Sequence, residues 1–335
     1  MEDAIRLPLG QPIVSSWANH SHILSIISRS PDSVNWIYSN YIQLELIEAL
    51  NDDLMLLNYS FPTTPEDACQ LLDVTRCPRE SVELGGGLVN FLKESLRNKQ
   101  YVYLFLDAFY MLGYPFYEAE HVPHDPLIVG FDDREQVFYL ADFHVSTGGI
   151  VKYGIFAVSY RQVEQSYYLL PPEGDRMNGI ELFGYRADAK CRFDADLVKL
   201  YLSDYLNASF TLSKEQTWLS TKVAAYGIEI YDYLFKQLSL VKEERQAPDF
   251  RLVHVLHDHK TLMYNRLKHM NGMGYISEER SRSYGQVVKD CVKLRNSALK
   301  YGVTGNKAFL TEAQHTLQAI LENEKQILYS VYVEI

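Results

Sequence analysis

Two side chains in the middle of the chain have the types and the spacing of a general base and its orienting partner. His124 stands just before a short apolar run, residues 127–131, and Asp142 lies near the end of a second run, residues 137–143. The acidic turn between the runs predicts a β-hairpin that brings both side chains to the same end. A carboxylate that holds one imidazole nitrogen leaves the other free to accept a proton. The alternative is that His124 only begins one strand and Asp142 only ends the other.

We expect the group that such a pair could activate at the start of a helix near the N-terminus. Ser15 and Ser16 precede a stretch, residues 17–27, whose apolar side chains recur at helical spacing. We expect a helix with its N-cap at one of these serines. The free amides and positive dipole end of a helix N-terminus assist a nucleophile and an oxyanion placed there. The alternative is that the serines only cap the helix.

Composition narrows the classes of partner and the compartment. The net charge of −11 over 335 residues argues against nucleic acid or an anionic membrane as the main partner. No apolar stretch is long enough for a transmembrane helix, and no signal peptide is recognised. The cysteines are far apart and form no metal-binding or disulfide framework, which favours a reducing cytoplasm, and we expect no cofactor and no metal. They are Cys69, Cys77, Cys191 and Cys291.

The first half of the chain mixes short strands with short helices. Its patterns predict a hairpin of residues 41–50 and 54–59 around a turn at 51–53, a helical turn at 67–72, a helix over 84–96 interrupted by three glycines, strands over 101–109, 150–159 and 180–186, and a helix over 160–168.

The second half has a helical period throughout. Residues 197–206, 223–238, 252–270, 286–299 and 311–327 each carry an apolar face, which predicts five or six helices. We therefore expect an α+β protein with a first domain over 1–190 and an all-helical bundle over 191–335. The bundle packs on the first half or on a partner, and a homodimer through the helical half is one arrangement that this allows.

Two groups of histidines suggest metal sites, but neither has the required spacing. His254, His257 and His259 place at most two side chains on one helical face and lack the glutamate of a metalloprotease helix. A packed or solvated helix is the better interpretation. A metal-dependent hydrolase that uses His121, together with its neighbours His124 and Asp125, lacks a third ligand.

The hairpin also carries a family resemblance. The segments HDPLIVGFDD at 124–133 and FYLADF at 138–143 resemble the butirosin biosynthesis protein H-like family, and they are similar to the peptidase domains that trim bacteriocin leaders. The segments YIQL at 41–44, CP at 77–78 and YVYLFLD at 101–107 look like the branch found in gene clusters for peptide natural products. The resemblance covers about residues 12–185 and implies a papain-like antiparallel sheet with an N-terminal helix.

The resemblance assigns roles to two residues and leaves a third role open. It gives His124 the place of the base and Asp142 that of its orienting partner. The family has a cysteine at the start of the first helix, where this chain has Ser15 and Ser16 and no cysteine. A serine with a His/Asp pair is chemically competent, whereas the loss of the thiol is also what a site without covalent chemistry would show.

Two further residues are candidates for the same site. Gln11 lies close to the place where papain-like enzymes keep an oxyanion-hole glutamine. Cys77 stands before Pro78 where a helix is expected to begin, and such a position would lower the pKa of the thiol. A buried structural cysteine is the alternative.

These features lead to two functional hypotheses. The first is an acyl- or aminoacyltransferase, or a related amide-forming or amide-cleaving enzyme, that acts on a peptide-like or acyl substrate, carrier-bound in one version. Like charges argue against an acidic carrier protein as the donor. The second is a non-catalytic module of the same fold that binds a biosynthetic peptide or holds an enzyme complex together.

Overall fold

The computed structural model describes residues 2–48, 55–146, 148–171, 173–212, 222–244 and 249–335. The chain divides into two compact units. Unit 1 contains residues 1–33 and 65–191, and unit 2 contains residues 34–64 and 192–335. The boundary expected near residue 190 lies close to the point, after residue 191, where the chain passes from unit 1 to unit 2 for the last time. Residues 34–64, however, belong with the helical half and not with the first domain to which we had assigned them.

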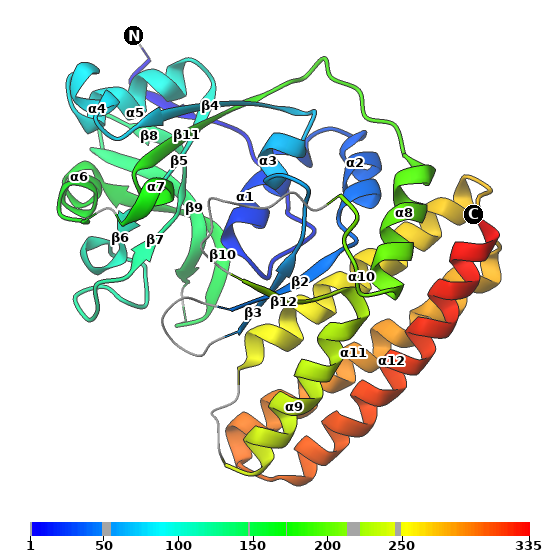
Figure 1. Cartoon of the computed structure of the whole chain (residues 1–335). Helices are drawn as coiled ribbons and strands as arrows, with labels where there is room; N and C mark the ends of the chain where they lie inside the picture. Colours follow the sequence, from blue (N-terminus) through cyan, green and yellow to red (C-terminus); the bar gives the residue numbers. More distant parts are fainter. Residues whose placement is uncertain (1, 49–54, 147, 172, 213–221, 245–248) are drawn as a thin grey trace. The chain divides into compact units, whose positions relative to one another are not determined.

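An antiparallel sheet forms the centre of unit 1, and with its helices it gives the expected α+β class (Figure 1). The strand order is β10-β9-β8-β5-β11-β4. Strand β1 is not part of this order and pairs with β8. These strands are β1 (Ala4–Arg6), β4 (Leu72–Pro78), β5 (Gln100–Leu104), β8 (Leu127–Asp132), β9 (Val137–Val145), β10 (Val151–Ser159) and β11 (Gly179–Tyr185).

The predicted hairpin is the pair β8 and β9. Leu127 pairs with Ala141 and Asp132 with Val137, so the acidic turn lies between the strands as expected. The first five residues of β8 are buried, which explains its continuous apolar run. Gly130 lies so close to the carbonyl oxygen of Ile5 that a Cβ atom there would collide with the backbone of β1.

The helices of unit 1 pack on this sheet. They include α1 (Ala18–Ile27) against β9, α5 (Leu88–Arg97) against β5 and β8, and α6 (Tyr160–Tyr168) against β9 and β10. Ser159 and Gln162 form a capping box that starts α6. The N-cap of α1 is Trp17 and not Ser15 or Ser16, and the Trp17 side chain makes no capping hydrogen bond.

Three predictions in unit 1 need correction. The helix expected over 84–96 is two helices, α4 (Ser81–Leu84) and α5, because Gly86 and Gly87 between them have positive φ angles. The strand expected over 101–109 divides into β5, β6 (Leu106–Asp107) and a 3₁₀ turn η1 (Ala108–Tyr110). Cys77 and Pro78 end strand β4 rather than begin a helix. The other short elements are α3 (Pro65–Ala68), β7 (Pro123–His124) and α7 (Gly174–Met177).

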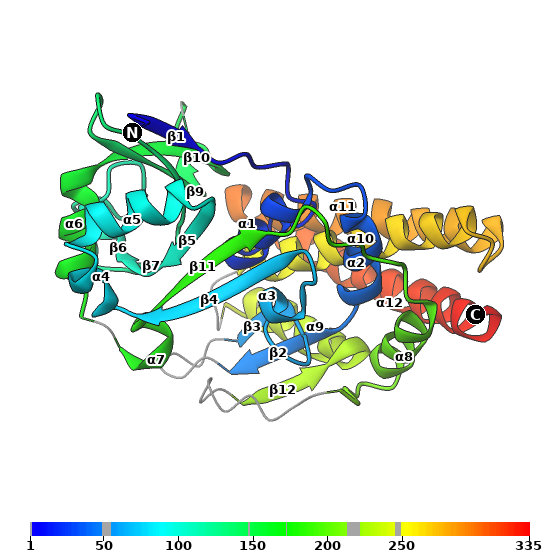
Figure 2. The same ribbon diagram turned by 90° about the horizontal axis from the view of Figure 1, so that it is seen from above.

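Unit 2 combines a small sheet with long helices. The hairpin β2 (Leu44–Glu48) and β3 (Met55–Tyr59) is confirmed, while its turn at 51–53 lies outside the described residues. The half expected to be all helical contributes a third strand, β12 (Val223–Tyr226), which pairs with β2. The helices are α2 (Ser33–Asn40), α8 (Ala195–Leu206), η2 (Gly227–Glu229), α9 (Ile230–Lys242), α10 (Phe250–Gly272), α11 (Glu278–Thr304) and α12 (Ala308–Glu334), of which α10, α11 and α12 run alongside one another (Figures 1 and 2).

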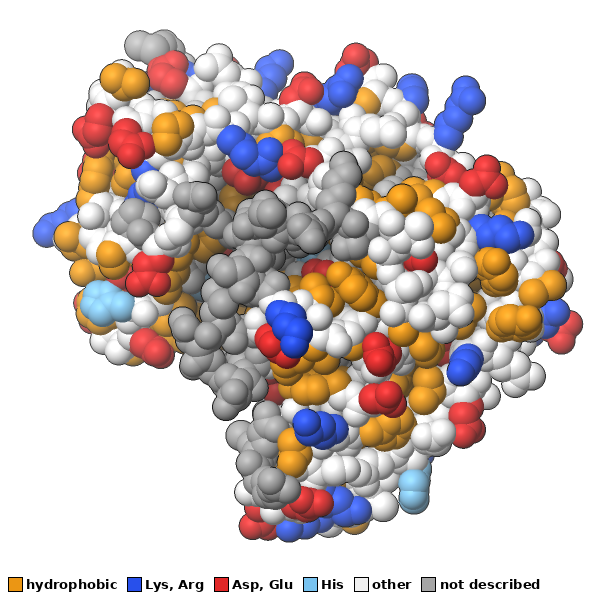
Figure 3. Space-filling model, in the orientation of Figure 1, with side chains coloured by type: hydrophobic (Ala, Val, Ile, Leu, Met, Phe, Trp, Pro, Cys, Tyr) orange, Lys and Arg blue, Asp and Glu red, His pale blue; other side chains and the backbone are white. Residues whose placement is uncertain are grey.

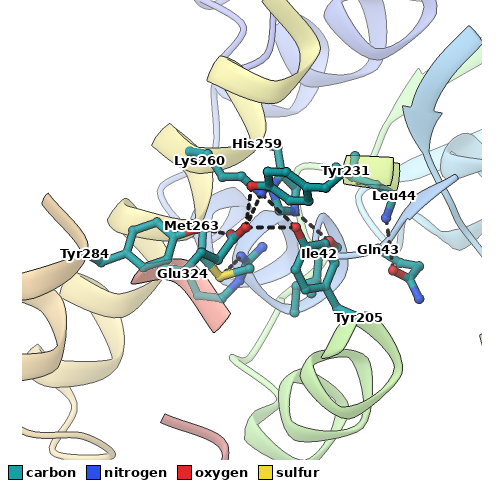
Figure 4. A network of polar contacts seen from close by, with 11 residues as sticks. Ile42, Gln43, Leu44, Tyr205, Tyr231, His259, Lys260, Met263, Tyr284 and Glu324 are labelled. Carbon is teal, nitrogen blue, oxygen red and sulfur yellow. Dashed lines mark hydrogen bonds and ion pairs between the residues drawn. The ribbon is translucent and has the colours of Figure 1, made fainter. Parts of the chain in front are cut away.

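A buried ion pair lies among the five helices α8 to α12 (Figure 4). Lys260 Nζ is 2.8 Å from Glu324 Oε2, and both side chains are fully buried. Three tyrosine hydroxyls donate to the Glu324 carboxylate, from Tyr205, Tyr231 and Tyr284. Because each of the five helices contributes at least one member, the network specifies how they pack.

Every proton of the Lys260 ammonium group has an acceptor. Besides Glu324, Lys260 Nζ donates to Tyr205 Oη at 2.7 Å and to His259 Nδ1 at 3.0 Å. His259 Nε2 then donates to the carbonyl oxygen of Ile42 at 2.8 Å. Complete satisfaction of this kind is what makes a buried charge tolerable.

A second buried cation joins α10 to the segment before β2. Arg266 is fully buried and donates to the carbonyl oxygens of Tyr38 and Tyr41, each at 2.6 Å. These acceptors lie at and just after the C-terminal end of α2, where a positive charge is favourable. Burial lowers the pKa of Arg266 to about 10. The two hydrogen bonds from Arg266 tie Tyr38 and Tyr41 to α10, which helps to explain why residues 34–64 belong to the helical unit.

No helix within the described part of the chain is long and apolar enough to cross a membrane.

Candidate functional site

The structure brings His124 and Asp142 together in unit 1. His124 Nδ1 lies 2.8 Å from Asp142 Oδ2, and the Asp142 side chain is fully buried while that of His124 is 21% exposed. The carboxylate lies off the direction of the Nδ1–H bond, so the contact is an ion pair rather than an aligned hydrogen bond. With Nδ1 facing the carboxylate, Nε2 is the nitrogen left for proton transfer.

Short strands position the two residues. His124 pairs with Leu106 in the two-stranded ribbon of β6 and β7, at the beginning of the hairpin. Asp142 lies on β9 opposite Gly154 of β10. The missing side chain at Gly154 leaves room for the ring of His144, which stacks on Phe156 at 4.6 Å between centroids.

The charged forms of His124 and Asp142 stabilise each other. Burial opposes protonation of His124, but the hydrogen-bonding and charge interactions with Asp142, together with the charge of Asp125, raise its pKa above the ordinary value. Burial likewise opposes ionisation of Asp142, yet His124, His22 and Tyr114 together lower its pKa. The arrangement therefore favours an ionised aspartate beside an imidazole that readily accepts a proton.

His22 on α1 joins that helix to the segment that carries the pair. It is fully buried, and its Nε2 donates to the carbonyl oxygen of Asp125 at 2.9 Å. Its Nδ1 accepts from the hydroxyl of Tyr153 at 2.9 Å, so both nitrogens are engaged by neutral partners. Burial lowers the pKa of His22. The side chain of Asp125 accepts from Tyr103 at 2.7 Å.

Ser16 is the better placed of the two serines. Its Oγ is buried and has no hydrogen-bond partner within the described part of the chain. It stands two residues before the first residue of α1, the helix that also carries His22. Ser15 is half-buried and makes polar contacts of its own. With no hydrogen-bond partner, Ser16 Oγ is not bonded to His124, so the contact that would activate a serine nucleophile is not formed in this structure, and burial limits access to the hydroxyl.

Gln11 and Cys77 lack the surroundings expected of them. Gln11 is exposed. Cys77 lies on the edge strand β4, where its thiol makes a long 3.9 Å contact to the carbonyl oxygen of Ile180. Burial raises the pKa of Cys77, contrary to the lowered pKa that a reactive thiolate needs.

A second His–Asp pair lies close in sequence. His121 Nδ1 is 2.6 Å from Asp107 Oδ2, and the imidazole stacks on Phe109 at 4.2 Å between centroids. Asp107 is opposite Pro123 in the ribbon, next to the Leu106–His124 pair, so the two strand pairs point to opposite faces. His121 thus belongs to a separate pair and does not join His124 and Asp125.

A metal site would need several suitable side chains in one place among the described residues. Among them, no group of three or more His, Cys, Asp or Glu side chains is arranged to hold a metal ion. Of the clustered histidines His254, His257 and His259 on α10, His259 is a member of the buried lysine network. On the face shown in Figure 3, Lys and Arg side chains are scattered rather than gathered into one patch.

No protein-family model matches this chain, and no curated protein matches it at a significant level.

Sequence reasoning did not identify Tyr114, His22 or Tyr103 as part of the site. Their partners are 22 or more residues away in the chain, and the Tyr153 contact of His22 spans 131 residues. An aromatic or histidine residue inside an apolar run has the same pattern whether it packs in the core or supports a site. The high tyrosine content, 25 residues, is typical of buried rings with a polar tip but does not indicate which of them support a site.

Proposed function

We propose that this protein is an acyl- or aminoacyltransferase, or a related enzyme that forms or cleaves an amide bond of a peptide-like product. The observation that supports it is the 2.8 Å contact between His124 and the fully buried Asp142, in the same unit as a helix start that carries an unpaired buried serine hydroxyl. The resemblance of the hairpin to the butirosin biosynthesis protein H-like family supports the same class.

In this scheme Ser16 Oγ attacks the carbonyl carbon of a thioester, ester or amide. His124 Nε2 takes the hydroxyl proton and passes it to the leaving thiol, alcohol or amine as the tetrahedral intermediate collapses. Amides at the start of α1 stabilise the oxyanion. An amine then attacks the acyl-serine to form the product amide, or water attacks it to release the acid.

The geometry of the site can be tested without knowing the substrate. In Ser16→Cys, the thiol would lose its proton to His124 if the two are within reach, so iodoacetamide should alkylate it rapidly at neutral pH. Burial raises the pKa of all four native thiols, which keeps the background low. Adding His124→Ala should slow alkylation about tenfold or more, the scale of general-base effects.

Two control variants make this test specific. Ser15→Cys places a thiol one residue away, and His121→Ala removes the imidazole of the second His–Asp pair. The alkylation rate of Ser15→Cys should not depend on His124. Adding His121→Ala to Ser16→Cys should leave the alkylation rate unchanged. If Ser16→Cys reacts no faster than Ser15→Cys and His124→Ala leaves its rate unchanged, the assignment of Ser16 and His124 to one site is wrong.

Acyl transfer itself is tested by intact mass. The wild-type protein is incubated with short acyl thioesters and p-nitrophenyl acetate, and we expect an acyl adduct that disappears in Ser16→Ala and in His124→Ala but persists in His121→Ala. An adduct that remains in Ser16→Ala would assign the nucleophile elsewhere.

The second candidate is a non-catalytic binding module of the same fold. The burial of Ser16 Oγ favours it, because a substrate carbonyl has to reach that atom. It predicts that no donor acylates the wild-type protein and that a peptide-like ligand binds equally well to Ser16→Ala, as measured by calorimetry. In either case we place the protein in the cytoplasm, where its free cysteines stay reduced.

A further inference from the structure

Tyr114 contacts both members of the His124/Asp142 pair. Its side chain is buried, and its hydroxyl donates to Asp142 Oδ2 at 2.6 Å. That oxygen is the same one that lies 2.8 Å from His124 Nδ1. The phenol ring also packs against the imidazole, with 4.7 Å between the centroids. One tyrosine therefore supplies the aligned hydrogen bond that the ion pair lacks and a flat surface for the imidazole.

The other oxygen of Asp142 is fixed as well. Asp142 Oδ1 accepts from the backbone amide of Phe143 at 2.6 Å. With a donor on each oxygen, the carboxylate is held against rotation, with Oδ2 2.8 Å from His124 Nδ1. Removal of the phenol donor would free the carboxylate on the side that meets the imidazole.

The loop that carries Tyr114 is attached to the strand of Asp142. Gly113 has a φ of 106°, which favours glycine, and a Cβ there would lie 3.1 Å from the ring of Phe156. The carbonyl oxygen of Gly113 accepts from the amide of Val145 at 2.7 Å. Tyr114 is thus held beside β9 by the backbone and beside Phe156 by its ring.

From this geometry we infer that Tyr114 is a positioning residue that holds Asp142 and His124 in the orientation needed for proton transfer. The inference rests on the proposed function, since it concerns how the base of that reaction is set. The other ionisable neighbours of His124 have different partners: Asp125 accepts from Tyr103, and His22 donates to the Asp125 carbonyl. Tyr114 alone among these neighbours donates to the oxygen that His124 meets.

The test is Tyr114→Phe, which keeps the ring and removes only the hydroxyl. Without the phenol donor, Asp142 keeps more of its negative charge for the imidazole, so the pKa of His124 should rise. Histidine-selective NMR titration of the full-length protein measures this directly. If Ser16 is acylated in the wild type, the acylation rate should fall about tenfold and its pH midpoint should move upward, on the scale of one lost charge-assisted hydrogen bond.

Tyr160→Phe is the matched control. Tyr160 donates to Asp133 Oδ1 at 2.9 Å in the same unit, so this variant also removes one tyrosine–aspartate hydrogen bond. It should leave the titration of His124 unchanged. A purely structural role for Tyr114 would lower thermal stability in both variants and move the His124 titration in neither.

The outcomes separate the inference from the proposed function. Asp142→Asn should lower the pKa of His124, and if it does not, the pair is absent and the proposed function fails. If Asp142→Asn lowers this pKa while Tyr114→Phe leaves it unchanged, the inference about Tyr114 is wrong. If Tyr114→Phe raises it in a protein that no acyl donor modifies, the inference stands and the transferase proposal falls.

Discussion

His121 and His124 lie on one short stretch of chain and each faces an aspartate that is almost fully buried, but their imidazoles differ in exposure. The His121 side chain is 62% exposed, and that of His124 is 21% exposed. Desolvation strengthens the interaction of His124 with its carboxylate and restricts which molecules reach it. The His121–Asp107 pair is therefore an internal control for the His124–Asp142 pair in any experiment on proton transfer.

The first prediction concerns the pH dependence of the base. His124 must be neutral to accept a proton, and its pKa is raised above the ordinary 6.5. Acylation of the wild-type protein should therefore rise with pH to a midpoint above 6.5. The stability that the ion pair contributes has the opposite sign: it is complete below the unfolded pKa and is lost as pH rises through the raised folded pKa.

Rates of acyl-adduct formation between pH 5 and 9 measure this midpoint, and the NMR titration of His124 supplies its independent value. A kinetic midpoint below 6.5, or one that disagrees with the His124 titration, would contradict the assignment of His124 as the base.

At the scale of elements, the sequence predicts whatever a local pattern encodes. The hairpin β8–β9 and the helices α8, α10, α11 and α12 follow from apolar periodicity and turn residues within a few turns of the chain. Strand β4 was missed because several of its side chains are exposed and its pairing partner β11 lies about 100 residues later. The polar contacts around His124 join residues 22 to 131 positions apart in the chain, so only the pair itself could be predicted.

A second prediction concerns the close approach of β1 to β8. Gly130→Ala should destabilise unit 1 by about 1–3 kcal/mol, because the added methyl group meets the backbone of Ile5 and Arg6, which cannot move without loss of pairing. Gly184→Ala on β11 is the control, since its Cβ would lie 3.5 Å from the Asp73 side chain, an ordinary contact. Urea unfolding measures both. Equal stability of the two variants would contradict this explanation.

A third prediction concerns the lysine network of unit 2. Lys260→Met leaves the Glu324 carboxylate buried without its cation and should cost about 3–5 kcal/mol of unfolding free energy. Adding Glu324→Gln removes that charge and keeps one acceptor oxygen, enough for the two tyrosines that share Oε2, Tyr205 and Tyr231. The double variant should therefore be more stable than Lys260→Met alone. Chemical denaturation of the four proteins in the cycle gives the coupling energy, and additive losses would rule out the interpretation.

For the whole molecule, the main feature is that both units are discontinuous in sequence. Unit 2 needs residues 34–64 for two strands of its sheet and for the carbonyl groups that meet His259 and Arg266. The sequence predicts one boundary because its composition changes once, near residue 194, whereas the pairing of β2 with β12 depends on the tertiary structure. Domain assignment from composition therefore gives a single boundary, whereas the chain passes between the two units three times.

The fourth prediction is that a fragment of residues 192–335 does not fold by itself. Without residues 34–64, Arg266 and His259 would be buried with unmet hydrogen bonds, each costing about 1–3 kcal/mol or more. A single chain that joins 34–64 to 192–335 through a flexible linker should fold. Dispersion of amide proton NMR signals distinguishes the two. A well-dispersed spectrum from 192–335 alone would show that the first segment is dispensable.

The order of the segments along the chain also determines when each part of unit 2 can fold during synthesis. Strands β2 and β3 emerge early, but α10 and α12 follow only after most of the chain has been made. At about 5–20 residues per second, the roughly 270 residues after position 64 take roughly 15–50 s to translate. Until synthesis has passed α10, the β2–β3 hairpin lacks its full set of packing partners, which are β12, α9 and α10.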